Sequence, residues 1–308
     1  MTTAAPAILV AGSANLDFVV RAARIPAPGE TVLGREFRTY PGGKGANQAI
    51  ACARAGGAAT QMLLALGEDD FARPIERSLQ DAGVLLHTVR ISHQPTGTAF
   101  ICLSDDAENA ITVAPGANAG LLPAHLPALA GVSHLLMQLE TPVPTVLAYA
   151  FAARAAGITV VLNGAPAQPL PDELLAALDL LIVNEGELAA ISKTRVADGG
   201  DGVDAAIAAL RVPNVIVTLG ARGCRARCGD QHFSQGAFAV QAVDTTAAGD
   251  TFCGALVADL SRGATWPLAM LFASAAAALA CTRLGAQTSI PARDEVLAFL
   301  QSQQPATA

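Results

Sequence analysis

The segment over residues 242–252 reads Ala242-Val243-Asp244-Thr245-Thr246-Ala247-Ala248-Gly249-Asp250-Thr251-Phe252 and joins the end of a β-type stretch to an apolar helical pattern over 252–260. Three small residues in its turn, Ala247, Ala248 and Gly249, would present free backbone N–H groups at the positive end of the helix dipole. We therefore expect an anion such as a phosphate group to bind at this helix start.

Asp250 falls in the middle of this expected anion site. A carboxylate would repel a bound phosphate, so a role as phosphate ligand is unfavourable. It can instead take a proton from an attacking hydroxyl group, while the N–H groups hold the charge on a transferred phosphoryl group. From the local sequence alone, the alternative is that Asp250 only caps the following helix.

Composition and charge exclude several classes of protein. The chain has 308 residues and a formal net charge of -7, whereas a nucleic-acid-binding surface is normally basic. No stretch of about 20 residues is apolar enough to span a membrane, and the start of the chain does not read as a secretory signal. The six cysteines lack zinc-site spacing and are expected to stay reduced. We expect a cytoplasmic protein that binds neither nucleic acid nor membranes.

Short apolar runs alternate with longer Ala- and Leu-rich segments of helical period, which predicts an α/β fold with a mostly parallel central sheet. In such a sheet the ligand cleft lies beyond the carboxyl ends of the strands. Strands are expected at 8–11, 60–65, 135–138, 159–163, 180–183 and 215–218, and helices at 46–55, 72–82, 144–156, 171–177, 185–192, 202–210, 251–262, 266–283 and 293–301.

Two regions interrupt this α/β rhythm, one at 18–40 and one at 89–113. Their alternating character and turns are closer to an antiparallel layer than to βαβ units. We expect them to form a small β-sheet that projects from the main domain as a lid and excludes water from the ligand cleft. If the outer face of this lid is apolar, two copies would pack lid to lid as a symmetric homodimer.

Polar side chains follow the first strand and the lid region. Asn15 and Asp17 lie two residues apart, so in an extended segment both can bond a polyhydroxylated substrate; a turn stabilised by these side chains is the alternative. The run Pro41-Gly42-Gly43-Lys44-Gly45-Ala46-Asn47-Gln48 opens a helix and lacks the Walker spacing. Its glycines would let the backbone approach a sugar, Asn47 would bond hydroxyls, and Lys44 is either a ligand or a solvated charge.

Further candidates follow later strands. Glu140 comes after a strand end and has either a ligand role or a surface or helix-start role. Asn184 and Glu187 fit a helix-capping box, or alternatively hold water-bound magnesium near phosphates. Two glycines in the run 218–223 fit either a nucleotide contact or a plain β-turn.

Together these motifs resemble the ribokinases of the PfkB carbohydrate kinase family. Gly42-Gly43-Lys44-Gly45-Ala46-Asn47 matches the N-terminal signature of that family, and 244–250 matches its C-terminal signature of Asp-Thr, two variable residues and Ala-Gly-Asp. Asn184-Glu185-Gly186-Glu187 matches its Asn-x-x-Glu motif. The resemblance extends from about residue 8 to residue 300. It implies a single domain over 1–308 with the ribokinase-like three-layer α/β/α fold and an inserted lid.

The resemblance also implies roles for individual residues. Asp250 would be the base for the 5-hydroxyl of ribose, and Ala247, Ala248 and Gly249 the anion hole for the γ-phosphoryl group of ATP. The sugar would be held by Asn15, Leu16, Asp17, Gly43, Lys44, Gly45, Ala46, Asn47, Glu140 and Asp250. ATP would lie among Asn184, Thr218, Leu219, Gly220, Ala221, Arg222, Gly223, Gly249, Asp250 and Ser274. K⁺ would be held by Asp244, Thr246, Ala280, Arg283, Gly285 and Ser289, several through backbone carbonyls, and Mg²⁺ by Glu187 through water.

The chain departs from the family pattern at three places. Ser274 stands where a histidine near the adenine is expected, which puts the adenine contacts in doubt. Asn163-Gly164-Ala165-Pro166 replaces the usual Asn-Pro-Ala-Pro, and Ala72 or Arg73 stands where a glycine is frequent. None of these changes touches the expected base or the sugar carboxylates.

The sequence thus predicts an enzyme that phosphorylates D-ribose at O5 with ATP. A family member for fructose, deoxyribose or adenosine is the alternative, because specificity depends on pocket shape. A non-catalytic sugar-binding protein on the same fold is the alternative from another class. A Rossmann dehydrogenase is disfavoured, because Gly12-Ser13-Ala14-Asn15 stands where its GxGxxG would follow the first strand.

Overall fold

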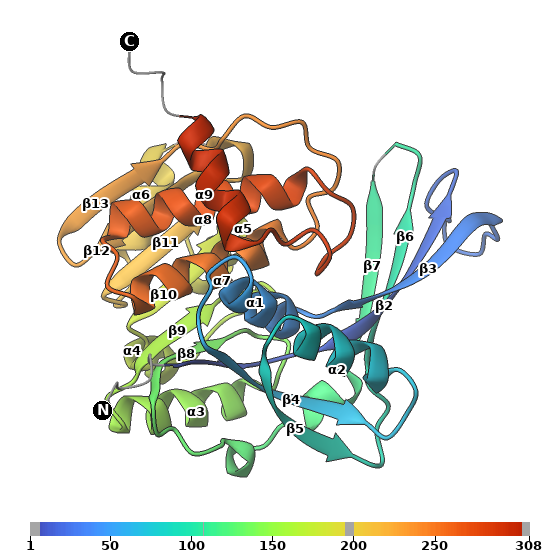
Figure 1. Ribbon diagram of the computed structural model, residues 1–308, viewed down its shortest axis with the longest axis horizontal. Coiled ribbons are helices and arrows are strands. Elements are labelled where there is room, and N and C mark those ends of the chain that lie inside the picture. Colours follow the sequence, from blue (N-terminus) through green and yellow to red (C-terminus); the bar gives the residue numbers. More distant parts are fainter. Residues whose placement is uncertain (1–6, 107, 195–199, 304–308) are drawn as a thin grey trace.

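The computed structural model describes residues 7–106, 108–194 and 200–303 (Figure 1). Among these residues, nine strands form the main sheet. Seven neighbouring strands are parallel, and the last two form an antiparallel hairpin at one edge. In spatial order the strands are β13 (Gln231–Gln235), β12 (Cys224–Cys228), β11 (Asn214–Thr218), β10 (Leu180–Asn184), β9 (Thr159–Asn163), β8 (Val132–Met137), β1 (Ala7–Ala11), β4 (Thr60–Gly67) and β5 (Leu85–Ile91).

Helices cover both faces of this sheet, because its strands are apolar on both sides. In β1, Ile8 and Val10 belong to one core and Leu9 and Ala11 to the other, as the period of two along a strand requires. The first core is covered by α1 (Lys44–Ala53), α2 (Ala72–Asp81), α7 (Ala248–Ser261), α8 (Trp266–Cys281) and α9 (Arg293–Ser302), and the second by α3 (Val143–Ala155), α4 (Asp172–Ala177), α5 (Glu185–Ser192) and α6 (Gly200–Ala208). Three short 3-10 helices are η1 (Gly116–Gly120), η2 (Pro123–His125) and η3 (Gly220–Arg222).

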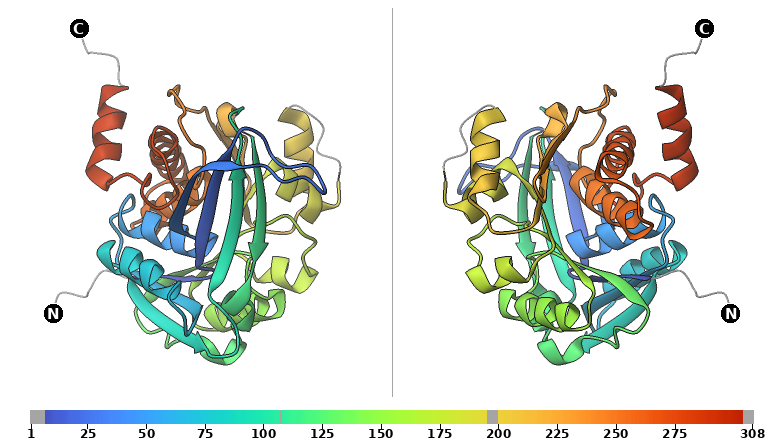
Figure 2. Two further views of the ribbon diagram at one scale, coloured as in Figure 1. Left: turned by 90° about the vertical axis from the view of Figure 1, so that its right-hand side faces the viewer. Right: turned by 90° about the vertical axis from the view of Figure 1, so that its left-hand side faces the viewer.

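The orange and red helices lie on one side of the sheet and the green and yellow ones on the other (Figure 2). The predicted three-layer α/β fold is therefore confirmed. Of the described helices, none is both long and apolar enough to cross a membrane.

A second sheet stands away from the main domain at the right of Figure 1. Its order is β3 (Gly34–Gly42), β2 (Asn15–Ala22), β6 (Gly97–Leu103) and β7 (Asn109–Ala114). β2 follows β1 after a short turn, and β3 leads directly into α1, so this sheet is anchored at the carboxyl end of β1. It is the lid expected from the sequence.

Two details of the lid differ from expectation. The range 89–113 begins too early, because residues 89–91 end β5 in the main sheet. The sheet is also mixed rather than antiparallel, since β2 and β6 run parallel while the outer pairs are antiparallel. Strands β5, β12 and β13 of the main sheet were not expected.

Candidate active site

Asp250 lies in the first turn of α7 but does not cap it. The cap position belongs to Ala247, which has a left-handed φ of 59°. The Asp250 carboxylate instead accepts hydrogen bonds from two side chains of α1: Asn47 Nδ2 at 3.0 Å from Oδ2 and Gln48 Nε2 at 2.9 Å from Oδ1. The capping alternative is therefore wrong. This buried carboxylate is held by another helix.

The turn before α7 presents backbone donors to a pocket. The N–H of Ala248 bonds the Thr245 carbonyl at 3.2 Å, whereas those of Ala247 and Gly249 have no partner among the described residues. Two of the three predicted N–H groups are thus free for a ligand. They lie on a pocket that is also lined by Asp250 and by Lys44 from the start of α1. Asn184 and Thr218, at the carboxyl ends of β10 and β11, and Glu187, in the first turn of α5, line it as well.

Lys44 lies close to the Asp250 carboxylate, and Glu140 contacts Lys44. The attraction of Asp250, followed by that of Glu140, raises the pKa of Lys44 despite its burial. The Glu140 carboxylate accepts the Ser13 hydroxyl at 2.6 Å and the Lys44 backbone N–H at 3.1 Å. Lys44 is therefore not a solvated surface charge. Glu140 contacts the start of α1 rather than that of its own following helix.

Asp17 is the second buried carboxylate of the site. Burial, together with repulsion from Glu140 and Asp250, raises its pKa to about 7. Its Oδ1 atom and Oδ1 of Asn47 are buried acceptors without a partner among the described residues. Buried polar atoms are normally hydrogen-bonded, so these two acceptors are available to hydrogen-bond donors of a ligand.

Asn15, the neighbouring candidate, is fixed by a residue that sequence reasoning missed. Asn118 Nδ2 donates to Asn15 Oδ1 at 2.8 Å and to the Ala14 carbonyl at 3.2 Å, while Asn118 Oδ1 accepts the Ala14 N–H at 3.0 Å. Since Oδ1 of Asn15 is engaged, its Nδ2 is the atom left to donate to a ligand.

Gly43 and Gly45 are each required by close contacts within the chain itself. Gly43 has a φ of 90°, and a Cβ there would lie 2.8 Å from the Ala14 Cα. A Cβ on Gly45 would lie 2.6 Å from the backbone nitrogen of Ser13. These glycines let the start of α1 pack on the turn between β1 and β2. The side chains of Leu16 and Ala46 belong to the hydrophobic core, so only their backbones can face a ligand.

A second, more apolar pocket adjoins the turn of α7. Of the residues predicted around ATP, it is lined by Thr218, Gly220, Ala221, Gly223, Gly249 and Ser274. Leu219 packs instead against the core, and the Arg222 side chain pairs with Glu185. Phe252, Ala277 and Ala278 supply apolar walls, which suits a flat aromatic base.

Asn184 and Glu187 form the capping box that their spacing predicts. The Glu187 N–H donates to Asn184 Oδ1 and the Asn184 N–H to Glu187 Oε2, both at 2.8 Å. Burial raises the pKa of Glu187. The capping role is confirmed, and the same carboxylate lines the pocket next to Asp250.

Of the six residues expected to hold potassium, Asp244 and Thr246 lie in the loop before α7, and Gly285 bonds Asp244. Asp244 accepts the N–H of Thr246 at 2.9 Å and that of Gly285 at 3.0 Å. Burial alone would raise the pKa of Asp244, but these hydrogen bonds outweigh it and lower the pKa below its ordinary value. The Ala280 carbonyl accepts the Arg283 N–H, and the Ser289 hydroxyl donates to the Ala286 carbonyl. The Arg283 side chain pairs with Glu295, so only its backbone suits a cation. Carboxylate, carbonyl and hydroxyl oxygens fit a hard cation.

The described side chains contain no cluster of three or more His, Cys, Asp or Glu suited to a metal. A direct magnesium site of several carboxylates is therefore not built into the described chain. Glu187 can contribute one carboxylate through water, which fits the preference of Mg²⁺ for keeping its waters.

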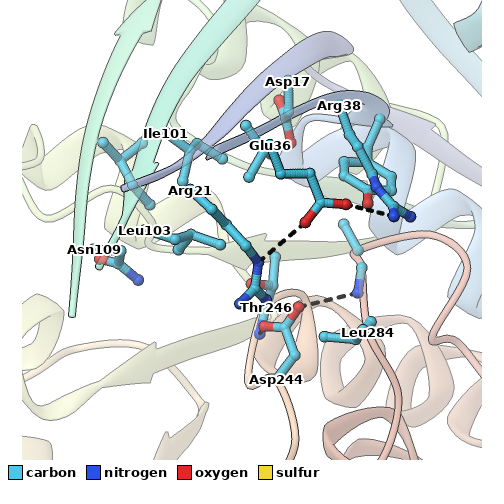
Figure 3. Close-up of a pocket in the computed structure, with 15 residues that line it drawn as sticks. Asp17, Arg21, Glu36, Arg38, Ile101, Leu103, Asn109, Asp244, Thr246 and Leu284 are labelled. Carbon is cyan, nitrogen blue, oxygen red and sulfur yellow. Dashed lines mark hydrogen bonds and ion pairs between the residues drawn. The ribbon is translucent and has the colours of Figure 1, made fainter. Parts of the chain in front are cut away.

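The inner face of the lid closes a third pocket against the loop before α7 (Figure 3). Asp17, Arg21 and Glu36 come from the lid, and Asp244 and Thr246 lie opposite them. Arg21 pairs with Glu36 at 3.9 Å. The lid, which carries Asp17, therefore faces the loop in front of α7 across this pocket.

Comparisons with known proteins agree with this geometry. The sequence profile described as pfkB family carbohydrate kinase matches residues 5–293. A ribokinase from Haemophilus influenzae is 40% identical over 302 residues, covering 96% of this chain and 98% of the relative. A crystal structure of ribokinase from Thermotoga maritima superposes with a TM-score of 0.88 at 38% identity, over 96% of this chain and 99% of that one. The Arabidopsis thaliana ribokinase complexed with ribose and ATP gives a TM-score of 0.88 at 34% identity, with coverage of 96% and 99%.

Proposed function

Because the chain belongs to the pfkB family of carbohydrate kinases, we propose that it transfers the γ-phosphoryl group of ATP to O5 of D-ribose. The observation that carries the proposal is the buried Asp250 carboxylate at the start of α7, which has both oxygens held by amide donors from α1. Unpaired N–H groups and Lys44 share its pocket. A base and electrophilic groups therefore meet at one point, as phosphoryl transfer requires.

In this reaction Asp250 takes the proton of the 5-hydroxyl as that oxygen attacks the γ-phosphorus atom. The N–H groups of Ala247 and Gly249 hold the charge on the transferred group. Lys44 assists them, because its raised pKa keeps the ammonium charged. Asp17 Oδ1 and Asn47 Oδ1 accept hydrogen bonds from the remaining sugar hydroxyls, and Asn15 Nδ2 donates one. The lid covers the sugar and keeps water out.

ATP would lie across the two pockets that meet at Gly249, with the adenine between Phe252 and the Ala277–Ala278 side of α8 and with Ser274 at its edge. Mg²⁺, when bound with ATP, neutralises charge on the phosphates, and we assign its water-mediated contact to Glu187. Potassium would be held by the oxygens around Asp244 and Thr246. It would fix the geometry of the loop that carries the N–H donors.

The lid also offers a surface for a partner, which we propose to be a second copy of the chain. Its face opposite the sugar pocket carries a stack of phenylalanines, with Phe18 5.4 Å from Phe100 and 6.1 Å from Phe37 between ring centroids. We assign to this face the lid-to-lid contact of a homodimer.

We place the enzyme in the cytoplasm, where ATP is made and where its six unpaired cysteines stay reduced.

The decisive experiment is a coupled assay of ADP release with ribose, deoxyribose, fructose and adenosine as acceptors. We expect the highest kcat/KM with ribose. D250N should bind ribose with unchanged affinity in calorimetry but turn over at least about a hundredfold more slowly, because the base is lost. Faster turnover of adenosine or fructose would replace the proposed substrate. Ribose and ATP binding without any turnover would instead support a non-catalytic sugar-binding protein.

A further inference from the structure

Beneath Asp250 lies a chain of three buried carboxamides for which the sequence predicts no role. Gln48 and Gln138 have no exposed surface, and Asn163 is 8% exposed. Gln48 Nε2 donates to Asp250 Oδ1 and to Asn163 Oδ1, both at 2.9 Å. Gln138 Nε2 donates to Gln48 Oε1 at 2.6 Å. These residues come from α1, the end of β9 and the segment after β8, so the network ties three elements to the base.

One backbone carbonyl fixes the direction of every bond in this chain. The Ile182 carbonyl can only accept, and it accepts Asn163 Nδ2 at 3.0 Å. Asn163 therefore turns its Oδ1 toward Gln48. Since the carboxylate of Asp250 is also an acceptor when ionised, Gln48 must present its N–H₂ group to both and turn its Oε1 toward Gln138. The amide orientations follow from the chemistry of the two ends.

Gly164, which stands where the family pattern usually has a proline, also bonds the Ile182 carbonyl. The Gly164 N–H donates to the Ile182 carbonyl at 2.9 Å, a bond that the more usual proline has no N–H to make. A Cβ on Gly164 would lie 2.8 Å from side-chain atoms of Ile191 and of Val183. In this chain the carbonyl that orients Asn163 is thus held by the residue that follows it.

Asn47 and Gln48, consecutive residues of α1, hold different oxygens of one carboxylate. With both oxygens engaged, the carboxylate cannot rotate, and its remaining lone pairs keep one direction toward the pocket. A general base must lie within hydrogen-bond reach of the proton that it abstracts, so this orientation bears on the rate of the reaction.

We infer that Gln48 is a positioning residue: through the Ile182–Asn163–Gln48 chain it holds the Asp250 carboxylate in the orientation that receives the proton of the sugar hydroxyl. This inference rests on the proposed function, in which Asp250 is the base. Gln48 does not touch the sugar, since it lies wholly beneath Asp250. Its effect therefore falls on kcat rather than on ribose binding.

The test compares Q48M with Q138M. Q48M keeps the length of the side chain and removes the N–H donor to Asp250. Q138M removes a bond of the same buried network but leaves the Gln48–Asp250 bond, and so controls for loss of packing and stability. The charged groups that act on Asp250 from other elements, Lys44, Asp17 and Glu187, are unchanged in both variants.

We expect kcat to fall about ten- to a hundredfold in Q48M, the range for one hydrogen bond to a charged group, with the Kd for ribose changed less than about twofold. Q138M should lose thermal stability to a similar extent but keep kcat within about threefold. Equal losses of kcat in the two variants, or unchanged kcat in a folded Q48M, would overturn the inference.

A second readout needs no turnover. The carboxylate ¹³C resonance of Asp250, assigned by its absence in D250N, should shift in Q48M and stay in place in Q138M. If Q48M fails to fold, Q48E keeps the shape and replaces the donor by an acceptor; its Asp250 resonance must then move, and an unmoved signal would contradict the assignment. Absence of turnover in the unaltered enzyme would reject the proposed function instead, while this resonance would still report on Gln48.

Discussion

Gly42 leaves open the space that the Asp17 carboxylate occupies: a Cβ on Gly42 would lie 2.1 Å from Asp17 Oδ2. The two residues are on adjacent strands, since Asn15 pairs with Gly42 at the end of the β2–β3 ladder. The first glycine of the 42–45 run is thus explained by the room that the Asp17 carboxylate needs rather than by the turn. It keeps the acceptor Oδ1 of Asp17 in the site.

We predict that G42A displaces this carboxylate and raises the KM for ribose about ten- to a hundredfold, because a charge-assisted hydrogen bond to the sugar is lost. The KM for ATP should stay unchanged. G236A is the matched control, since a Cβ at Gly236 meets nothing within 4 Å. Steady-state kinetics with each substrate varied checks the prediction, and an unaltered KM for ribose in G42A would refute it.

The raised pKa of Asp17 also predicts how the stability of the fold depends on pH. Its pKa is raised from 3.8 to about 7, first by burial and then by Glu140 and Asp250, so folding favours the protonated form. The stability that this proton contributes is complete below about pH 4 and is lost as the pH rises through about 7. At about 1.4 kcal/mol per pKa unit, the loss amounts to at most about 4 kcal/mol.

D17N carries an amide in place of this carboxylate and should escape that loss. We expect D17N to unfold at a higher temperature than the unaltered enzyme at pH 8, to match it near pH 4, and to bind ribose weakly at both. Calorimetric unfolding without ligands at the two pH values measures this difference. A gap in Tm that is the same at pH 4 and pH 8 would contradict the raised pKa.

The parts of the fold that could be predicted are those whose side chains carry a local signal. β1 reads as an apolar run because both of its faces are buried, and the period of Ala248–Ser261 marks α7. β12 escaped prediction because Cys-Arg-Ala-Arg-Cys alternates buried small residues with half-buried arginines, without a β-branched run. The end of β5, residues 89–91, was assigned to the lid because only its pairing with β4 places it in the main sheet.

Residues of the candidate site could likewise be predicted only where the local sequence carries a signal. Asp250 and Lys44 could be proposed because their neighbours in sequence are glycines and small residues of recognisable spacing, and Asp17 because it lies two residues after Asn15 beyond the first strand. Gln48 and Asn118 could not, because a glutamine in a helix gives no local sign that it contacts a carboxylate 202 residues away, and Asn118 meets Asn15 across 103 residues. Such contacts exist only once the strands have set the positions of the helices.

Asn184 and Glu187 offer a test that separates helix capping from magnesium binding. N184A removes the side-chain acceptor of the capping box and should cost about 1 kcal/mol of unfolding free energy. E187Q keeps an oxygen that can accept the Asn184 N–H, and so should leave stability unchanged. It loses the charge that faces the phosphates, however.

We therefore expect E187Q to need about tenfold more Mg²⁺ for half-maximal activity, the scale at which residues that hold a metal through a second layer affect its binding. Titration of activity with Mg²⁺ at saturating ATP measures this requirement, with N184A as the control for stability. An E187Q enzyme with the ordinary magnesium requirement would restrict Glu187 to its capping role.

The outer face of the lid makes the last prediction. Phe37 is 59% and Phe100 55% exposed, and both stack on Phe18, a costly arrangement for a surface in water. If two lids pack through this face, the protein should show the mass of two chains in light scattering at micromolar concentration. F100E, which places a charge in the centre of that contact, should then give a single chain. L268E is the control, because Leu268 is equally exposed, at 58%, on α8 of the main domain. A single-chain mass for the unaltered enzyme, or a dimer that persists in F100E, would exclude this face as the interface.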